Sequence, residues 1–342
     1  MAKTLKDVAS AAGVSSATAS LVLNGRADGR VSLELAAKVE QAAEKLDYRP
    51  NLVARSLRTQ VSKTLGLISN DVATSPFAGA MLAGAKEVAW EQGWLLFLVN
   101  TNDDKEMEAA ATHSLIQRNI DGLIYAAMYH QEIEAPEYFK DQKFVLLDCI
   151  DSKGQFDSVV PQEYEGALSA MEYLIEQGHI KIAHLTTGEK TIAGQERLRA
   201  YKDVLTKNKV KIDNSFIIEA KSSNSIDGYH ATQKLLQSKN LPTAIFCYTD
   251  RMAMGAYEAI AEAGLSIPKD ISVVGFDNQL NIADALRPGL TTVQLPHYEM
   301  GAWAVNRLLA TIESENSEPR EPEHMRIACP LVVRSSVAPP RK

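Results

Sequence analysis

The sequence predicts a small all-α domain at the N-terminus, joined by a short hinge helix to an α/β body that consists of two lobes. Residues 1–47 hold three short helical patterns separated by turn signals. From about residue 64, short apolar runs alternate with helical stretches, and this alternation occurs twice in succession. Such alternation is typical of a parallel sheet that is covered by helices on both faces.

The overall composition allows more than one domain and shows an uneven charge. The chain has 342 residues, 45% of them hydrophobic, and a net charge of -7. Residues 1–60 carry a net charge of +3, so the remaining chain carries -10. This asymmetry suits a DNA-contacting segment on an acidic body, because phosphates attract positive charge only where the DNA lies.

Cysteine usage and hydropathy indicate a cytoplasmic protein without a membrane segment. The three cysteines, Cys149, Cys247 and Cys329, are far apart and lie in apolar surroundings, so we expect reduced core thiols and neither a disulfide nor a metal. The start, MAKTLKDVAS, lacks the apolar run of a signal peptide, and no stretch approaches the roughly 18 apolar residues of a membrane span.

The first two helices have clear boundary signals. Thr4 precedes the first helix, and Asp7 stands three residues later, as in a capping box. Gly13 supplies a tight turn, and Ser15 caps a second helix that runs to about Leu23 and ends at an Asn-Gly pair. Two short helices joined by a glycine turn form a helix-turn-helix arrangement, which we assign to residues 1–47 together with the third helix.

The third helix and the hinge follow. Val31 and Ser32 mark a helix start, and the apolar stripe that follows can close a three-helix core. Residues 48–62 then carry Pro50 at a helix-start position, followed by an apolar stripe of about two turns. Because so short a helix is marginal in water, we expect this hinge to order only when two copies pack together on DNA. A plain flexible linker is the alternative.

The segments TLKDVASAAGVSSATASLVLNG and LDYRPNLVARSLR resemble the lactose-repressor (LacI/GalR) family of transcription regulators. In the body, GHIKIAHLTTG, ERLRAY, TDRMAMGAYEAI, SVVGFDN and RPGLTTVQLP also match, so the resemblance spans the chain. It implies that the second helix enters the major groove, with Ser15 and Thr18 capping it and touching phosphate. The DNA contacts that it implies are Thr4, Ser15, Ser16, Ala17, Thr18, Ser20, Leu21, Asn24, Tyr48, Asn51, Ala54 and Leu57.

Within this set, the resemblance places Ser16, Ala17 and Ser20 against base edges. These short side chains offer few hydrogen bonds, so direct base readout is expected to be sparse. Leu21 stands where the family commonly has an arginine, and it either contacts thymine methyl groups or is simply a buried leucine. The resemblance makes Leu57 the residue that wedges between base pairs in the minor groove.

For the body, the resemblance implies a fold similar to that of the periplasmic sugar-binding proteins, whose lobes close about a ligand. The chain crosses between such lobes three times, which places crossovers near Val160, Thr292 and Glu321. The first lobe then consists of residues 63–160 and 293–321, and the second lobe of residues 161–292 and 322–342.

The same resemblance predicts where a small effector binds. It maps Arg197 and Asp277 onto positions that hold effector hydroxyls, and a planar guanidinium with a carboxylate can meet the paired donors and acceptors of a sugar diol. The implied effector contacts are Ser75, Phe77, Asn102, Tyr125, Asp148, Arg197, Thr249 and Asp277. Alternatives remain for three of them, since Arg197 can pair with a nearby acid, Asp148 can cap a turn and Phe77 can belong to the core.

The resemblance therefore implies a sequence-specific repressor that binds a pseudo-palindromic operator as a homodimer and is released by a small effector, in this family usually a sugar. The alternative is a co-repressed or metabolite-sensing regulator that responds to a purine or a phosphorylated metabolite. Part of the dimer contact is expected on the first-lobe helix at residues 77–90, which offers Ala78, Met81, Leu82 and Ala85. Nothing in the sequence predicts a tetramer.

Two other classes of protein could share the α/β body, a sugar-binding transport protein and a sugar-modifying enzyme. The first needs a signal peptide and has no use for residues 1–60. The second needs a catalytic constellation, yet the chain contains no G-x-x-x-x-G-K-[ST], G-x-G-x-x-G, H-E-x-x-H, C-x-x-C or G-x-S-x-G motif. We therefore expect no enzyme activity, no cofactor and no metal.

Overall fold

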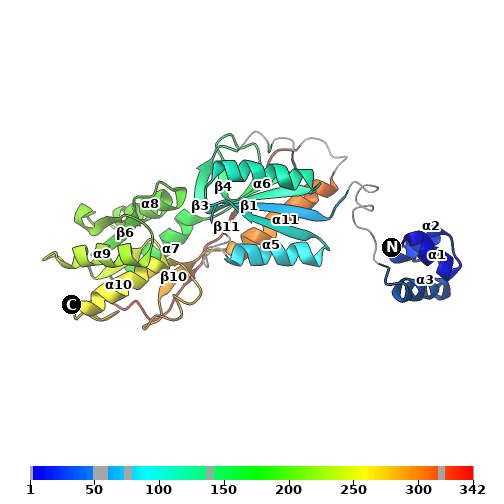
Figure 1. Ribbon diagram of the computed structural model, residues 1–342. Helices are drawn as coiled ribbons and strands as arrows, with labels where there is room; N and C mark the ends of the chain where they lie inside the picture. The colour runs from blue at the N-terminus through cyan, green and yellow to red at the C-terminus, as the bar shows by residue number, and fades with distance from the viewer. Residues whose placement is uncertain are drawn as a thin grey trace. The chain divides into compact units, whose positions relative to one another are not determined.

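The computed structural model describes residues 3–48, 61–72, 79–135, 139, 142–314 and 320–341. The chain divides into an N-terminal unit, Met1–Ser62, and a body, Lys63–Lys342 (Figure 1). No described helix combines the length and the apolar character that a membrane crossing needs. The predicted hinge helix lies mostly outside the described residues.

The described part of the N-terminal unit forms the predicted three-helix domain, with α1 (Leu5–Ala12), α2 (Ser16–Leu23) and α3 (Leu33–Lys45). The capping box of α1 is complete, because the side chain of Asp7 accepts from the backbone N–H of Thr4 at 2.8 Å and Thr4 in turn caps Asp7. Gly13 adopts the left-handed conformation, with a φ of 69°. The buried core is small, and it consists of Val8, Ala9, Ala19, Val22, Val39, Ala42 and Ala43.

The first lobe of the body is a parallel sheet in the order β11-β5-β4-β3-β1-β2. Its strands are β1 (Thr64–Ser69), β2 (Leu95–Asn100), β3 (Gly122–Ile133), β4 (Phe144–Asp151), β5 (Asp157–Pro161) and β11 (His324–Ile327). The helices α5 (Gly79–Glu91) and α11 (His297–Glu313) cover one face. Helix α6 (Lys105–Gln117) covers the other face, where Leu115 packs beside Ile68 and Leu123.

The second lobe repeats this architecture in the order β12-β10-β9-β8-β6-β7. Its strands are β6 (Ile182–Thr187), β7 (Ile217–Ala220), β8 (Ala244–Cys247), β9 (Ser272–Asp277), β10 (Thr291–Gln294) and the short antiparallel β12 (Leu331–Val332). Helices α7 (Glu163–Glu176) and α8 (Ile192–Lys207) cover one face, and α9 (Ser225–Leu236) and α10 (Asp250–Glu262) cover the other (Figure 1).

The crossovers between the lobes differ from the expected positions at two of three places. The first follows β5, close to the predicted Val160. The second follows β10, which pairs with β9 as far as Gln294, so it lies slightly later than Thr292. The expected crossover near Glu321 is wrong, because β11 pairs with β5 up to Ile327 and only the chain after it enters the second lobe.

Two glycines allow α5 and α11 to touch backbone to backbone. A Cβ atom on Gly84 would lie 2.0 Å from the carbonyl oxygen of Tyr298, and one on Gly301 would lie 2.0 Å from that of Met81. Only residues without a side chain fit at such distances. This contact fixes one face of α5 against α11.

That contact corrects the dimer surface predicted on α5. Met81 and Ala85 are fully buried and pack with the core beneath α11, so they are not available to a partner. Leu82 is partly buried against the same core, and Ala78 lies outside the described residues. The sequence pattern shows that α5 has an apolar face, but it cannot show that a helix more than 200 residues later covers it.

Candidate functional site

The N-terminal end of α2 is capped as predicted. The hydroxyl oxygen of Ser15 accepts from the backbone N–H of Thr18 at 3.0 Å and lies 2.9 Å from the Thr18 hydroxyl. At the other end, the Asn24 amide donates to the backbone carbonyl of Ser20 at 2.7 Å and to its hydroxyl at 3.2 Å. The serine hydroxyl expected to read a base is therefore already held by Asn24, and a base contact has to share or break this bond.

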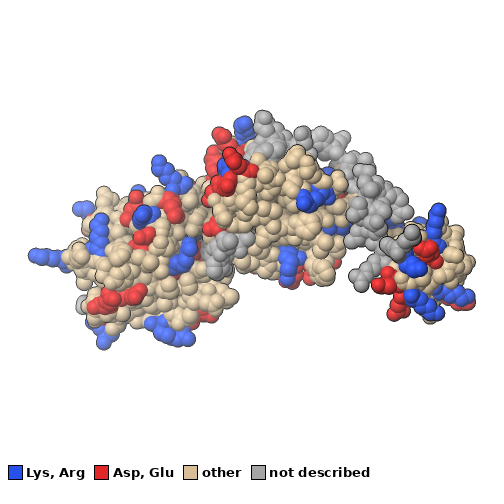
Figure 2. All heavy atoms as spheres, in the orientation of Figure 1, with Lys and Arg blue, Asp and Glu red and all other residues tan. Residues whose placement is uncertain are grey.

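The outer face of α2 carries the other residues predicted to read bases. Ser16 and Ala17 are exposed, while Ala19 on the opposite side is buried. Leu21 is only half-buried and does not belong to the three-helix core, which favours a contact with thymine methyl groups over a role in the core. Figure 2 shows basic as well as acidic side chains on the visible face of this unit.

The remaining predicted DNA contacts have different surroundings. Thr4 is exposed and caps α1, and Tyr48 packs against the three-helix core. Asn51, Ala54 and Leu57 lie outside the described residues. Their roles, like the phosphate contacts of Ser15 and Thr18, stay predictions.

In the body, a buried polar group joins the two lobes. It consists of Asp148 on β4 of the first lobe with Glu163, Arg197 and Asp277 of the second lobe, and we call it the interlobe polar group. Their charges act on one another, and each residue is at most 4% exposed. Three of the four are the predicted effector residues Asp148, Arg197 and Asp277, so the structure brings these three together.

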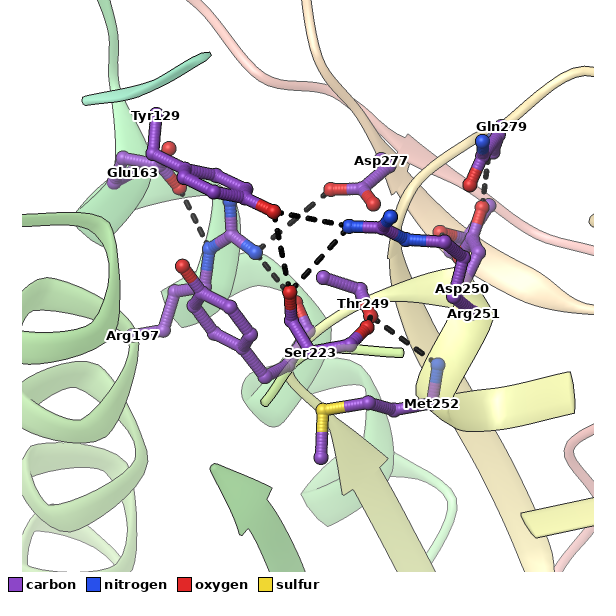
Figure 3. Close-up of polar contacts among 12 residues, drawn as sticks. Tyr129, Glu163, Arg197, Ser223, Thr249, Asp250, Arg251, Met252, Asp277 and Gln279 are labelled. Atoms are coloured by element: carbon purple, nitrogen blue, oxygen red, sulfur yellow. Dashed lines mark hydrogen bonds and ion pairs between the residues drawn. The ribbon is translucent and has the colours of Figure 1, made fainter. Parts of the chain in front are cut away.

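Arg197 is the centre of this group (Figure 3). Its Nε donates to Glu163 Oε2 at 2.7 Å, Nη1 donates to the backbone carbonyl of Tyr248, and Nη1 lies 3.8 Å from Asp277 Oδ1. The guanidinium also stacks on two rings, 3.6 Å from the centre of Phe276 and 4.5 Å from that of Tyr248. Arg197 thus pairs with a nearby acid, the alternative left open by the sequence, and this acid is Glu163.

The two aspartates have buried oxygens without a hydrogen bond. Oδ1 of Asp148 and both carboxyl oxygens of Asp277 have no hydrogen-bond donor among the described residues. Both residues also have positive φ angles, 59° and 117°, which side chains other than glycine rarely adopt. Burial raises the pKa of both carboxyls well above the ordinary value, and Arg197 opposes this rise. Such acceptors are suited to a ligand that supplies donors.

Two other predicted effector residues, Thr249 and Tyr125, do not join this group. The Thr249 hydroxyl donates to the carbonyl of Ser223 at 2.9 Å and accepts from Met252 N at 3.2 Å, so it caps α10. Tyr125 is buried in the first-lobe core and donates to Glu108 at 3.1 Å, which makes it a core residue instead of the predicted effector contact. Its side chain lies on the α6 face of the sheet, a choice of face that the strand pattern left undetermined.

The first-lobe loops contribute little within the described residues. Asn102 is exposed after β2, and its side-chain oxygen accepts from Asn100 at 2.7 Å. No contact described for Asn102 reaches Arg197. Ser75 and Phe77 lie outside the described residues.

Four residues near this group were not predicted. They are Glu163, the counter-charge of Arg197, and Tyr129, Ser223 and Arg251, which form hydrogen bonds between the lobes. A usable signal existed for Arg251, a charge in the otherwise apolar run TDRMAMGAY, and for Glu163, which directly follows a crossover. Tyr129 had no such signal, because its proximity to the second lobe depends on how the lobes meet.

Two family models match the chain. Residues 62–335 match the model described as periplasmic binding proteins and sugar binding domain of LacI family, and residues 4–51 match bacterial regulatory proteins, lacI family. The chain belongs to the LacI family. The resemblance deduced from the motifs is therefore confirmed, as is the predicted fold of a helix-turn-helix domain with a two-lobed body.

Individual LacI-family proteins match over nearly the whole chain. The HTH-type transcriptional repressor PurR of Escherichia coli O139:H28 is 34% identical over 339 residues, which are 98% of this chain and 97% of that protein. The structure of the lac repressor dimer bound to operator and the anti-inducer ONPF has a TM-score of 0.81 at 26% identity and covers 99% of this chain and 100% of that chain. A transcriptional regulator CelR–cellobiose complex has a TM-score of 0.70 at 25% identity, covering 98% and 99%. This LacI-family chain is a DNA-binding transcriptional repressor.

Proposed function

We propose that this repressor binds its operator as a homodimer and that a small molecule held at the interlobe polar group changes its operator affinity. The observation that carries this proposal is that oxygens on Asp148 and Asp277, which come from different lobes, accept no hydrogen bond within the described residues. A buried polar atom without a partner costs about 1–3 kcal/mol. A ligand that donates to both carboxylates recovers this cost and favours one arrangement of the lobes.

For the effector we propose a purine base ahead of a sugar. The relative named PurR favours the purine, the alternative left open by the sequence, over the sugar that the sequence resemblance placed first. A purine carries ring and amino N–H donors, which suit unpartnered carboxylates. A sugar is the second candidate, since its hydroxyls also donate and one similar solved structure is a complex with cellobiose.

The charge of the site argues against a phosphorylated effector. Asp148, Glu163 and Asp277 surround Arg197, and its charge is paired with Glu163. A further carboxylate, Asp250, acts on Asp277. Because the charge of Arg197 is already paired with Glu163, and burial already disfavours the charged forms of Asp148 and Asp277, burying a further anion here is unfavourable.

An exposed apolar edge supports the homodimer. Strand β2 is the edge strand of the first-lobe sheet, and Leu95, Phe97 and Leu98 on it are 49%, 44% and 42% exposed. Trp90 at the end of the neighbouring α5 is 71% exposed. A contiguous apolar edge of this kind marks an interface, because an unpaired strand with apolar side chains otherwise promotes association without specificity.

The test begins by selecting an operator from random duplexes with the full-length protein. Operator affinity is then measured by fluorescence anisotropy with and without adenine, guanine, hypoxanthine, glucose, ribose and cellobiose. We expect at least one purine to change the affinity by about tenfold, which corresponds to a coupling of about 1.4 kcal/mol. Asp148→Asn should lose this response and keep effector-free DNA binding.

Two controls test the effector response and the DNA-binding unit separately. Glu258→Gln, which changes an exposed carboxylate on α10, should respond as the parent does. A chain that lacks residues 1–60 should not bind the operator. Retained DNA binding by this truncated chain would show that the N-terminal unit is not the DNA-binding domain. A response only to phosphorylated compounds would contradict the proposed effector class.

A further inference from the structure

Three side chains form hydrogen bonds directly between the lobes (Figure 3). Nη2 of Arg251 donates to the Tyr129 hydroxyl at 3.1 Å and to the Ser223 hydroxyl at 3.4 Å. The Tyr129 and Ser223 hydroxyls lie 3.3 Å apart. Tyr129 belongs to β3 of the first lobe, whereas Ser223 and Arg251 belong to the second lobe. We call these three residues the interlobe tether.

The first-lobe half of the tether is aimed by an irregularity in β3. The pairing of β3 with β4 shifts between Ala126 and Gln131, and Tyr129 lies inside this stretch. A bulge breaks the strict alternation of side chains and turns one of them in a new direction. Here it directs Tyr129 toward the second lobe (Figure 3).

The second-lobe half is positioned by contacts within that lobe. Ser223 is 3% exposed, and its carbonyl accepts from the Thr249 hydroxyl, which also caps α10 at Met252. Arg251 is the second residue of α10, so the capped helix end and the loop after β7 present its guanidinium and the Ser223 hydroxyl together. Tyr129 therefore contacts two polar groups that the second lobe presents side by side.

The tether uses only the protein's own atoms. Its bonds leave the unpartnered oxygens of Asp148 and Asp277 available to an effector. At the same time, Asp277 is one of the charges that act on Arg251. An effector that neutralises or screens Asp277 therefore changes the electrostatic environment of a residue that holds the lobes together.

We propose that the interlobe tether holds the two lobes in their present arrangement in the absence of effector, and so sets the operator affinity of the effector-free repressor. This inference rests on the proposed function for its effect on DNA, but not for its effect on the lobes. Ligands act by shifting such an arrangement between states. The tether stabilises the lobe arrangement from which an effector has to shift the repressor.

The experiment compares two Tyr→Phe variants in the full-length protein. Tyr129→Phe removes the hydroxyl of the tether. Tyr164→Phe is the matched control, because its hydroxyl donates to Asp203 at 3.0 Å and both residues lie in the second lobe. Spin labels on Glu106→Cys in the first lobe and Lys234→Cys in the second report the interlobe distance, since the native cysteines Cys149, Cys247 and Cys329 are buried.

We expect the parent and Tyr164→Phe to give the same narrow distance distribution without effector. Tyr129→Phe should populate a second distance, with the equilibrium between lobe arrangements shifted by roughly tenfold, because a hydrogen bond from a charged donor is lost. Its effector-free operator affinity should change several-fold relative to Tyr164→Phe while the melting temperatures of the two variants stay similar. Arg251→Gln should have the same effect, and combining it with Tyr129→Phe should add little.

Identical distance distributions for Tyr129→Phe and Tyr164→Phe would overturn the tether. So would a Tyr129→Phe variant that changes only the melting temperature. If neither the parent nor any variant binds a selected operator, the proposed function fails, and the distance measurement still decides whether the tether holds the lobes.

Discussion

At the residue scale, the buried guanidinium of Arg197 depends on its partners. Glu163 pairs with it and is equally buried, at 3% exposure of each side chain. Burial of a charge is tolerated only when the partner charge and hydrogen bonds replace the lost water. Arg197 is therefore both a structural residue of the second lobe and a candidate effector contact. Its structural role is measured by protein stability, and its effector role by the response of operator affinity to the effector.

Removing Arg197 without Glu163 should strongly destabilise the protein. We expect Arg197→Ala to lower the free energy of unfolding by about 3–5 kcal/mol, because Glu163 is left buried without a counter-charge. Replacing both residues by methionine should recover most of this loss. Urea unfolding followed by circular dichroism measures both values, with Arg199→Ala as a control that removes an exposed pair with Glu196. Equal costs for Arg197→Ala and Arg199→Ala would contradict the argument.

His184 gives the second prediction at this scale. Its ring is fully buried between Tyr201 and Phe246, and burial lowers its pKa to about 4, despite a hydrogen bond to the Phe246 carbonyl. The unfolded chain therefore binds the proton at higher pH than the fold does. The stability from the neutral ring is fully present above the ordinary pKa of 6.5 and is lost as the pH falls toward 4.

We expect the unfolding free energy of the parent to fall by up to about 3 kcal/mol more than that of His184→Phe between these two pH values. Phenylalanine keeps the stacking but cannot take a proton. Urea titrations at several pH values, followed by circular dichroism, provide the comparison. Parallel pH profiles for the two proteins would show that His184 does not carry this dependence.

At the element scale, the contact between α5 and α11 decides how the first lobe is built. Gly84 and Gly301 let the helix backbones meet, and the same contact buries the α5 face that the sequence left available to a partner. A helix pattern defines which side is apolar. Only the packing of a distant segment decides what that side contacts.

Gly84→Ala should destabilise the protein by about 3 kcal/mol, because the new methyl group would overlap the Tyr298 carbonyl and force the helices apart. Gly79→Ala, at the first turn of the same helix, has no atom within 4 Å of the added Cβ and should be close to neutral. Thermal unfolding of the two variants tests this difference. A Gly84→Ala protein as stable as Gly79→Ala would mean that the helices move apart easily.

At the scale of the whole molecule, the proposed function requires two copies to act on one operator. The exposed apolar edge of β2 is the surface that we propose for their contact. A palindromic site presents two equivalent halves, so a monomer gains only half of the contacts. A variant that cannot form the dimer should therefore also bind the operator more weakly.

Phe97→Lys should convert the dimer to a monomer and weaken operator binding by at least tenfold, because the lysine charge cannot be buried at an apolar interface. Ile180→Lys is the matched control, since Ile180 is 67% exposed on the second lobe, away from this edge. Size-exclusion chromatography with light scattering gives the mass, and anisotropy gives the affinity. A Phe97→Lys dimer that binds normally would move the interface elsewhere.

The elements and their order could be predicted because they depend on local rules. The cap at Thr4, the turn at Gly13 and the alternating strand and helix patterns each involve residues close together in the chain. The motif resemblance also assigned Asp148, Arg197 and Asp277 to one site, and their charges act on one another in the structure; their contact with an effector stays a prediction. The crossover near Glu321 was misplaced because β11 is too short to show a strand pattern and is defined only by its pairing with β5.

The sequence by itself determined the helix-turn-helix unit, the two α/β lobes and the family to which the chain belongs, since periodicity, caps and motifs are written in neighbouring residues. Only the tertiary structure decided that Glu163 pairs with Arg197, that Tyr125 faces the α6 side, and that Tyr129 reaches Arg251 in the other lobe. Each of these contacts joins segments far apart in the chain. Their distance is set by how sheets, helices and lobes pack, which no local pattern encodes.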